Sequence, residues 1–134
     1  MTTKRYPIRL HQGETAQYTL YFWDVTYDAD GVEVTRQYTD LTGALITVTH
    51  APKGGGVAFL TKLSTDTSQV EILDQTDLDN GRGRAVLKYA SGDTDAKAPG
   101  EYEYDAWADL ADGRVKPSVD TSPFIVVRST RTPP

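Results

Sequence analysis

Hydrophobic and polar side chains alternate with a period of two along most of this chain, which is the pattern of β-strands with one buried face. The stretch 16–24 places Leu20 and Phe22 on one face, and the stretch 101–109 alternates tyrosine and alanine with acidic residues. Side chains on the common face are expected to pack between two sheets. The residues predicted to form this core are Tyr18, Leu20, Phe22, Ile46, Val48, Ile72, Leu87, Tyr104 and Phe124.

Turn-forming residues separate the predicted strands. Asp28–Gly31 would turn the chain, so residues 16–38 are predicted to form one hairpin in which Gly31 adopts a positive φ. The segment 91–100 has room for one helical turn at most, and no stretch has the periodicity of a longer amphipathic helix. The predicted strands are 16–24, 32–38, 44–50, 57–63, 69–73, 84–89, 101–109 and 122–129.

About seven to nine short strands in 134 residues predict an all-β protein, an antiparallel β-sandwich formed by a single domain, 1–134. The termini, about 1–5 and 129–134, are expected to be loose. The segments lying free of the sandwich are expected to extend over 1–10 and 128–134.

The chain has no cysteine, which excludes disulfides, thiol catalysis and cysteine-ligated metals. No apolar run has the length of a signal-peptide core or of a membrane-spanning helix, which needs about 20 residues. We therefore expect a protein that is made in the cytoplasm without a signal peptide, that stays there or leaves the cell by lysis or inside an assembly, and that does not insert into a membrane.

Charge is distributed unevenly along the chain. The net charge is −5, but residues 14–120 hold 9 of the 14 basic residues and all 19 acidic residues, a net of −10. The ends are basic because of Lys4, Arg5, Arg9, Arg128 and Arg131. A nucleic-acid partner is not expected, because phosphate binding requires clustered lysine and arginine.

The search for a catalytic constellation fails. His11 and His50 are the only histidines, neither lies in a nucleophile or metal-ligand motif, and both are interpreted as ordinary surface residues. The acidic residues of 101–109 have the separation of a glycosidase carboxylate pair, about 5–10 Å. A solvated sheet face has the same pattern, and that interpretation is favoured. We therefore expect neither an enzyme nor a cofactor.

Two Asp-rich segments could supply oxygen ligands to calcium. The first holds Asp24, Asp28 and Asp30, and the second, 74–81, holds three aspartates and Asn80. Neither has the EF-hand pattern, and turns require the same residue types. Both are interpreted as turns, and no metal site is predicted. The glycines at 54–56 lack the Lys-Ser/Thr that follows a phosphate-binding loop.

Outward-facing aromatic residues are the more informative signal. Trp107 is predicted to lie among acidic residues on the outer face of its strand, and Tyr21 and Trp23 lie on the face opposite Leu20. An exposed tryptophan can stack on a sugar or anchor a protein interface. Cover by the protein's own loops or by a second sheet is the alternative for all three residues.

Five short motifs carry a resemblance to a known family. They are the turn Asp40–Gly43 before a strand, the hairpin Ile72–Val86, the Pro-Gly-x-Tyr-x-Tyr strand in Asp93–Tyr104, the turn Asp112–Gly113 and the closing strand Phe124–Val126. Together they resemble the immunoglobulin-like domains of tailed-bacteriophage virion proteins, and most closely the N-terminal domain of phage baseplate upper proteins. The chain lacks the long C-terminal extension that carries receptor-binding modules in those baseplate proteins.

The resemblance implies an immunoglobulin-like sandwich and a non-enzymatic structural protein of a tailed phage particle, as capsid decoration, neck protein or tail or baseplate accessory. It implies location in the virion, other virion proteins as partners, and a homo-oligomer or multi-copy assembly. A carbohydrate-binding module that uses surface aromatics is the alternative function. Independently, Tyr102 follows Pro99-Gly100 at the start of an inner strand, where its hydroxyl can bond to upstream backbone as in the tyrosine corner of Greek-key sandwiches.

Charge and aromatic pattern together suggest how copies or partners would meet. We expect the basic ends to contact an acidic face of a neighbour, with Trp107 as an anchor inside an acidic rim. The predicted interface residues are Trp107, Glu103, Asp105, Asp109, Lys4, Arg5, Arg9, Arg128 and Arg131.

Overall fold

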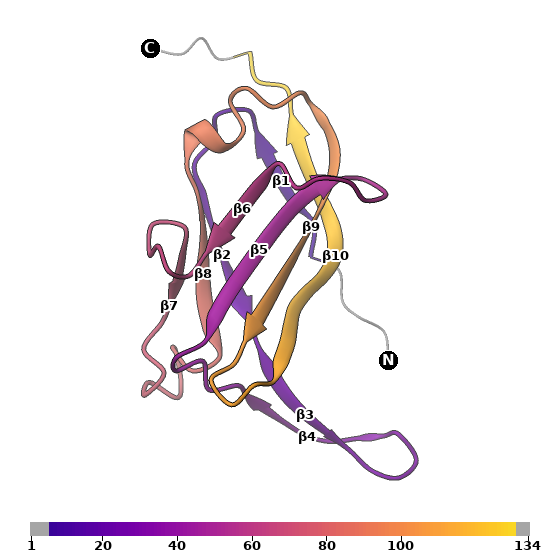
Figure 1. The fold of residues 1–134 in the computed structure, drawn as a ribbon, viewed down its shortest axis with the longest axis vertical. Helices are drawn as coiled ribbons and strands as arrows, with labels where there is room; N and C mark the ends of the chain where they lie inside the picture. The colour runs from indigo at the N-terminus through magenta and orange to yellow at the C-terminus, as the bar shows by residue number, and fades with distance from the viewer. Residues whose placement is uncertain (1–5, 131–134) are drawn as a thin grey trace.

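The structure, a computed structural model, describes residues 6–130 (Figure 1). These residues form β-strands joined by turns, with one 3-10 turn, η1 (Ser91–Asp93), in the segment where at most one helical turn was expected. The strands are β1 (Ile8–His11), β2 (Ala16–Tyr21), β3 (Trp23–Tyr27), β4 (Glu33–Tyr38), β5 (Leu45–Pro52), β6 (Leu60–Leu63), β7 (Val70–Ile72), β8 (Arg84–Tyr89), β9 (Gly100–Asp109) and β10 (Val115–Val127).

Two sheets face each other and a hairpin extends from one end. The larger sheet has the strand order β1-β10-β9-β5-β6, and the smaller has the order β2-β8-β7. Figure 1 shows β5, β6 and β9 in front of β2 and β8. All pairs are antiparallel except β1 with β10, which is parallel. The predicted all-β sandwich is therefore confirmed. No helix among the described residues is long and apolar enough to cross a membrane.

The core lies between the two sheets, where period-two patterning placed it. Seven of the nine predicted core side chains are buried; Tyr18 and Ile72 are partly exposed but pack against the core. Aromatic rings meet at its centre, with Phe124 in edge contact with the His50 ring at 4.8 Å between centroids. The predicted core residues that are buried are Leu20, Phe22, Ile46, Val48, Leu87, Tyr104 and Phe124.

The single hairpin predicted over 16–38 is wrong. β2 pairs with β8, and only β3 and β4 form a hairpin. The chain changes its pairing partner at Phe22, since the Phe22 N–H donates to the Gly83 carbonyl and the Phe22 carbonyl accepts from the Thr39 N–H. A Cβ on Gly83 would lie 2.8 Å from the Phe22 carbonyl oxygen, so only glycine allows this approach. The chain changes its strand partner at Phe22 while the side chain stays in the core.

The prediction that residues 1–10 lie free of the sandwich is also wrong for residues 8–10. Ile8–His11 form β1 at the edge of the large sheet, and Ile8 and Leu10 are 2% and 0% exposed. The described strands exceed the predicted seven to nine because β1 is present and the stretch 16–24 is divided between β2 and β3. β10 also begins seven residues earlier than the predicted last strand.

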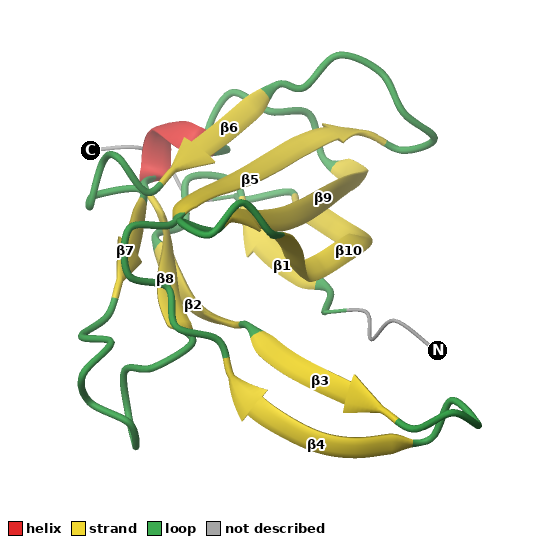
Figure 2. Cartoon of the chain, turned by 60° about the horizontal axis from the view of Figure 1, so that its bottom comes forward, coloured by secondary structure: helices red, strands yellow, loops and turns green. Residues whose placement is uncertain are grey.

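The β3–β4 hairpin extends away from both sheets (Figure 2). Its turn is held as the sequence indicated: Gly31 has φ 80°, and the Asp28 carboxylate accepts the N–H groups of Asp30 and Val32. Gln75 fixes the neighbouring loop at the base of the hairpin, because its side-chain oxygen accepts from the N–H groups of Leu41 and Gly83.

Candidate functional site

Trp107 lies on the outer face of the large sheet, as the alternation predicted. It is a half-buried residue of β9, and its cross-strand neighbours are Thr47 on β5 and Pro117 on β10. Asp105 and Asp109 lie two residues away on the same strand and share this face. The indole hydrogen-bonds the Asp105 side chain. The tryptophan is therefore held by its strand neighbours with acidic groups on both sides.

The acidic residues of β9 on this face differ in their hydrogen-bond and ion-pair partners. Burial raises the pKa of Asp105, Asp120 raises it further, and the hydrogen bond from Trp107 opposes both effects. At the other end of β9, Glu101 pairs with Lys53 at 2.9 Å and Glu103 accepts from the Gly54 N–H at 3.0 Å. The loop after β5 thus partners Glu101 and Glu103, whereas no basic side chain among residues 6–130 forms an ion pair with Asp105 or Asp109.

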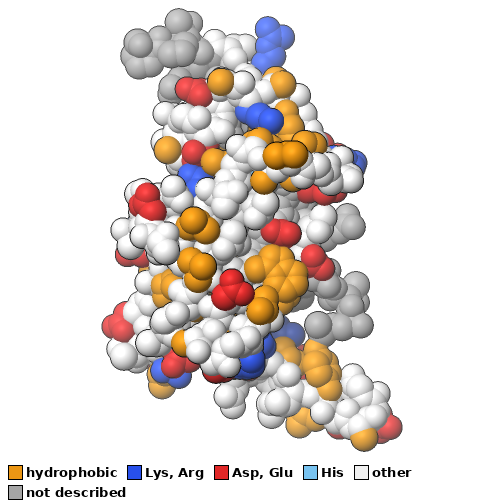
Figure 3. Space-filling model, viewed as in Figure 1, with side chains coloured by type: hydrophobic (Ala, Val, Ile, Leu, Met, Phe, Trp, Pro, Cys, Tyr) orange, Lys and Arg blue, Asp and Glu red, His pale blue; other side chains and the backbone are white. Residues whose placement is uncertain are grey.

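Exposed apolar residues adjoin Trp107. Leu45 on β5 and Val115 on β10 are both exposed, and each pairs with Asp109 of β9 from its own side. Figure 3 shows this mixture of hydrophobic and acidic side chains on the face that β5, β9 and β10 present to the viewer. An apolar centre with a charged rim is the usual composition of a protein contact. We name the residues Leu45, Asp105, Trp107, Asp109 and Val115 the Trp107 face.

The basic residues predicted to form the other half of an interface are not one free arm. Arg9 is an exposed residue of β1 and is separated from Glu101 only by Ile125 of β10. Its strand assignment corrects the expectation that it lies outside the sandwich. Arg128 directly follows β10 and is exposed. Lys4, Arg5 and Arg131 lie outside the described residues.

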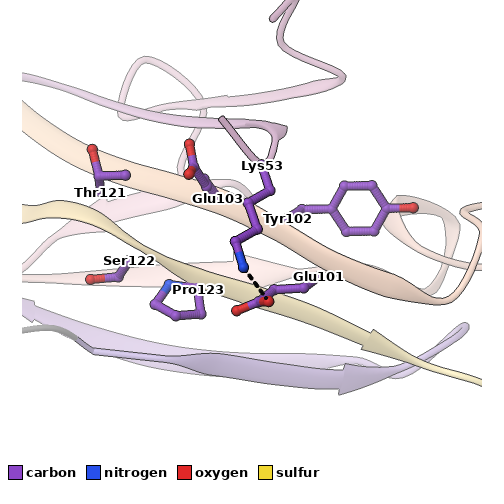
Figure 4. A pocket seen from close by; sticks show the side chains of 7 residues that line it. All are labelled: Lys53, Glu101, Tyr102, Glu103, Thr121, Ser122 and Pro123. Carbon is purple, nitrogen blue, oxygen red and sulfur yellow. Dashed lines mark hydrogen bonds and ion pairs between the residues drawn. The ribbon is translucent and has the colours of Figure 1, made fainter. Parts of the chain in front are cut away.

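A hollow of about 100 Å³ lies where the loop after β5 meets β10 (Figure 4). Lys53 points across it to Glu101, and the Tyr102 ring points away from that pair. Ser122 at its edge accepts the Tyr6 N–H. The charged side chains of this hollow already have partners: Lys53 pairs with Glu101, and Glu103 accepts a backbone N–H. We therefore interpret the hollow as a structural contact between the loop after β5 and the large sheet. Its lining residues are Lys53, Glu101, Tyr102, Glu103, Thr121, Ser122 and Pro123.

The interpretation of His50 as a surface residue is wrong. The side chain is fully buried, donates from Nδ1 to the Leu60 carbonyl at 3.1 Å and accepts at Nε2 from the Tyr89 hydroxyl at 2.6 Å. Burial lowers the pKa of His50 to about 4; the Leu60 hydrogen bond opposes this and the Lys62 charge adds to it. His50 is a neutral core residue. His11 is exposed, as expected, and its ring contacts Glu14 at 3.3 Å.

A buried ion pair beside His50 was not predicted from the sequence. Lys62 on β6 is 4% exposed, and its ammonium lies 2.5 Å from the Asp93 carboxylate. Lys62 faces inward because it lies opposite the core residue Val48 on β5. The pair closes the end of the core where η1 crosses between the sheets.

The Asp-rich segments use their carboxylates within turns. Asp74 accepts the N–H and the hydroxyl of Thr76, and Asp77 accepts the N–H groups of Asp79 and Asn80. Asp24 instead meets Lys116 at 2.8 Å and Arg114 at 3.1 Å. Among residues 6–130, no group of three His, Cys, Asp or Glu side chains has the geometry of a metal site.

Tyr102 occupies the position predicted for a tyrosine corner. Its hydroxyl donates to the Ala98 carbonyl at 2.6 Å, four residues upstream and just before the Pro99-Gly100 turn. The bond fixes the chain as it enters β9 and so sets the register from which Trp107 is presented.

Comparison with known proteins gives no family for this chain. No protein-family model matches it, and no curated protein sequence matches it significantly.

Proposed function

We propose that this domain is a non-enzymatic structural protein of a tailed phage particle and that it acts through protein–protein contacts. Capsid decoration, the neck, and an accessory position on the tail or baseplate are the locations this proposal includes. Its partners are other virion proteins, with the domain present in several copies in the particle.

The motifs of the resemblance support the proposal because each has a structural role. Asp40–Gly43 form the turn before β5, with the Asp40 carboxylate accepting the N–H of Thr42. Asp112–Gly113 turn the chain between β9 and β10, and Phe124 lies in the core from the last strand. The tyrosine corner at Tyr102 is the feature that most favours an immunoglobulin-like sandwich.

The observation that carries the proposal is the Trp107 face. Its tryptophan lies between Asp105 and Asp109, with exposed Leu45 and Val115 beside it. Aromatic residues in such surroundings contribute much of the energy of protein interfaces. Basic segments suit this acidic rim, and the chain's own ends supply them through Lys4, Arg5, Arg128 and Arg131. Arg9 would contribute from its fixed place on β1.

Incorporation into particles tests the proposal. In cells that encode this chain, particles are banded on a density gradient and the chain is quantified by mass spectrometry against the major capsid protein. We expect the wild type in the particle band and a reduced amount of Trp107→Ala. Leu78→Ala is the control, because Leu78 is exposed on a loop away from this face. Absence of the expressed wild-type chain from the band would refute the proposal.

A glycan array run with the same variants tests the alternative function. Glycan binding that is lost in Trp107→Ala and retained in Leu78→Ala would support a carbohydrate-binding module that uses surface aromatics.

A further inference from the structure

The β3–β4 hairpin is an arm without a covering layer. It forms a two-stranded sheet of its own, and no other strand among the described residues pairs with either edge. Every residue of β4 except Tyr38 is exposed, including Val34 at 61%, and Val32 before it is 60% exposed. A two-stranded hairpin is marginally stable alone in water, so the arm needs support from elsewhere.

The base of the arm receives that support from stacked side chains on one face. The rings of Trp23 and Tyr38 stack with centroids 3.8 Å apart. Arg36 lies over the Trp23 ring at 5.4 Å, and Arg84 of β8 lies over the Tyr38 ring at 4.2 Å. The two guanidinium groups flank the stacked pair of rings, and each is attracted to its ring through the ring quadrupole. The stack therefore ties the arm to the small sheet.

The opposite face of the base is tied to the large sheet. Asp24 accepts from the hydroxyl of Thr39 and forms ion pairs with Arg114, just before β10, and with Lys116 at the start of β10. Lys116 also donates to the Trp23 carbonyl at 2.9 Å. Burial raises the pKa of Asp24, but these partners outweigh burial and hold that pKa below its ordinary value. A base fixed on both faces presents the arm in one direction, which lowers the entropic cost of docking.

The outer edge of β4 is suited to strand addition. It borders solvent on the side away from β3 (Figure 2), and an unpaired strand edge exposes N–H and C=O groups that can pair with a further strand. A register irregularity lies between Thr26 and Tyr27, where Val34 is the extra residue on β4. It brings Glu33 and Arg36 onto the same face, where they form an ion pair at 2.8 Å.

We propose that β4 is a self-association edge whose partner is β4 of a second copy of this chain. The two strands pair antiparallel about a twofold axis, with Glu33 of each copy opposite Arg36 of the other. A twofold arrangement makes each contact occur twice. In this register both charge pairs are complementary, and Val34 of each copy lies opposite Thr35 of the other.

Charge complementarity is the reason for choosing a second copy as the partner. The same strand carries both members of the pair, so twofold antiparallel pairing of β4 with its copy can place Glu33 of each chain opposite Arg36 of the other. The edge is short, so association of isolated domains is expected to be weak; the many copies of an assembly would strengthen it through effective concentration. The inference goes beyond the proposed function, because it requires only this chain.

Charge-reversal variants test the pairing by light scattering and sedimentation over a concentration series up to about 1 mM, the weak end of measurable affinity. In a dimer of Glu33→Arg, two arginines oppose each other at both charge pairs, and in a dimer of Arg36→Glu two glutamates do. Each variant alone should weaken self-association about tenfold or more. An equimolar mixture should restore it, because both cross pairs are then complementary while the pair within each chain stays broken.

Glu71→Arg is the matched control, since Glu71 also forms an ion pair with a basic residue, Lys88, but lies on the small sheet. It should associate as the wild type does. Melting curves establish that each variant is folded. The inference would be overturned by a wild type that remains monomeric throughout, or by a mixture that associates as weakly as its components. It would also be overturned if either single variant associated as strongly as the wild type, or if the control associated more weakly.

Discussion

The buried His50 makes the free energy of unfolding depend on pH in a range where few other groups titrate. Its ring is surrounded by Tyr89, Tyr104, Phe59 and Phe124, and its Nδ1 is committed to the Leu60 carbonyl. Burial raises the pKa of Tyr89 well above its ordinary value, so that hydroxyl remains protonated and donates to Nε2. A proton on Nε2 would replace this accepted hydrogen bond with a charge in the core.

The size of the effect follows from the two pKa values. His50 titrates near 6.5 when unfolded and at about 4 when folded, so the unfolded state binds the proton more tightly. Stability is therefore full above pH 6.5 and is lost as the pH falls through 6.5 toward 4. A tenfold change in proton affinity is about 1.4 kcal/mol, so the whole loss is about 3 kcal/mol, of which about 2 kcal/mol appears between pH 7 and 5.

Urea denaturation at several pH values between 7 and 4.5 measures this loss directly. His50→Asn keeps a donor for the Leu60 carbonyl and removes the titrating ring, so its stability, lower at every pH, should change little over the same range. His11→Asn is the matched control and should retain the wild-type dependence, because that ring is exposed. Equal pH dependence in the wild type and in His50→Asn would refute the reasoning.

Three further predictions concern the core, the turn before β9 and metal. Phe124→Ala should lower the free energy of unfolding by about 3–5 kcal/mol in urea denaturation, because a fully buried ring leaves a cavity; a loss below about 1 kcal/mol would show that the site repacks. Tyr102→Phe should cost about 1 kcal/mol by removing the hydrogen bond to Ala98, and an unchanged melting curve would contradict that role. Calcium or EDTA should leave the melting temperature unchanged, because Asp28 and Asp74 already accept backbone N–H groups; a rise of several degrees with calcium would reverse this interpretation.

Much of the fold could be predicted from the alternation of residues, because each inner face is buried by a second sheet. β8 and β9 follow their predicted patterns residue by residue, with Leu87, Tyr104 and Ala106 inside. The pattern does not show which strands pair. The run 16–27 is a continuous extended segment in sequence, yet it changes partners at Phe22 through hydrogen bonds to Gly83 and Thr39, which lie far away in the chain.

Two errors in the prediction have different causes. His50 continues the inward alternation of Ile46 and Val48, so the pattern itself placed it inside, but its polarity favoured the surface. β1 was missed because its four residues, Ile8–His11, are too few to show a period, and a parallel partner more than 100 residues away leaves no local signal. The position of Trp107 could be predicted because its acidic neighbours on β9 fix which face it shares. The exposed arm could not be predicted, because the sequence does not show where the sandwich ends.

The most direct test of the central claim, that this domain acts through protein contacts made by the Trp107 face, is electron cryomicroscopy of particles from cells that encode the chain. The account predicts density for the sandwich in which Trp107 is covered by a neighbouring protein and Asp105 and Asp109 meet basic side chains at its rim. Particles in which the domain is present with Trp107 facing solvent in every copy, or particles that lack the domain altogether, would contradict it.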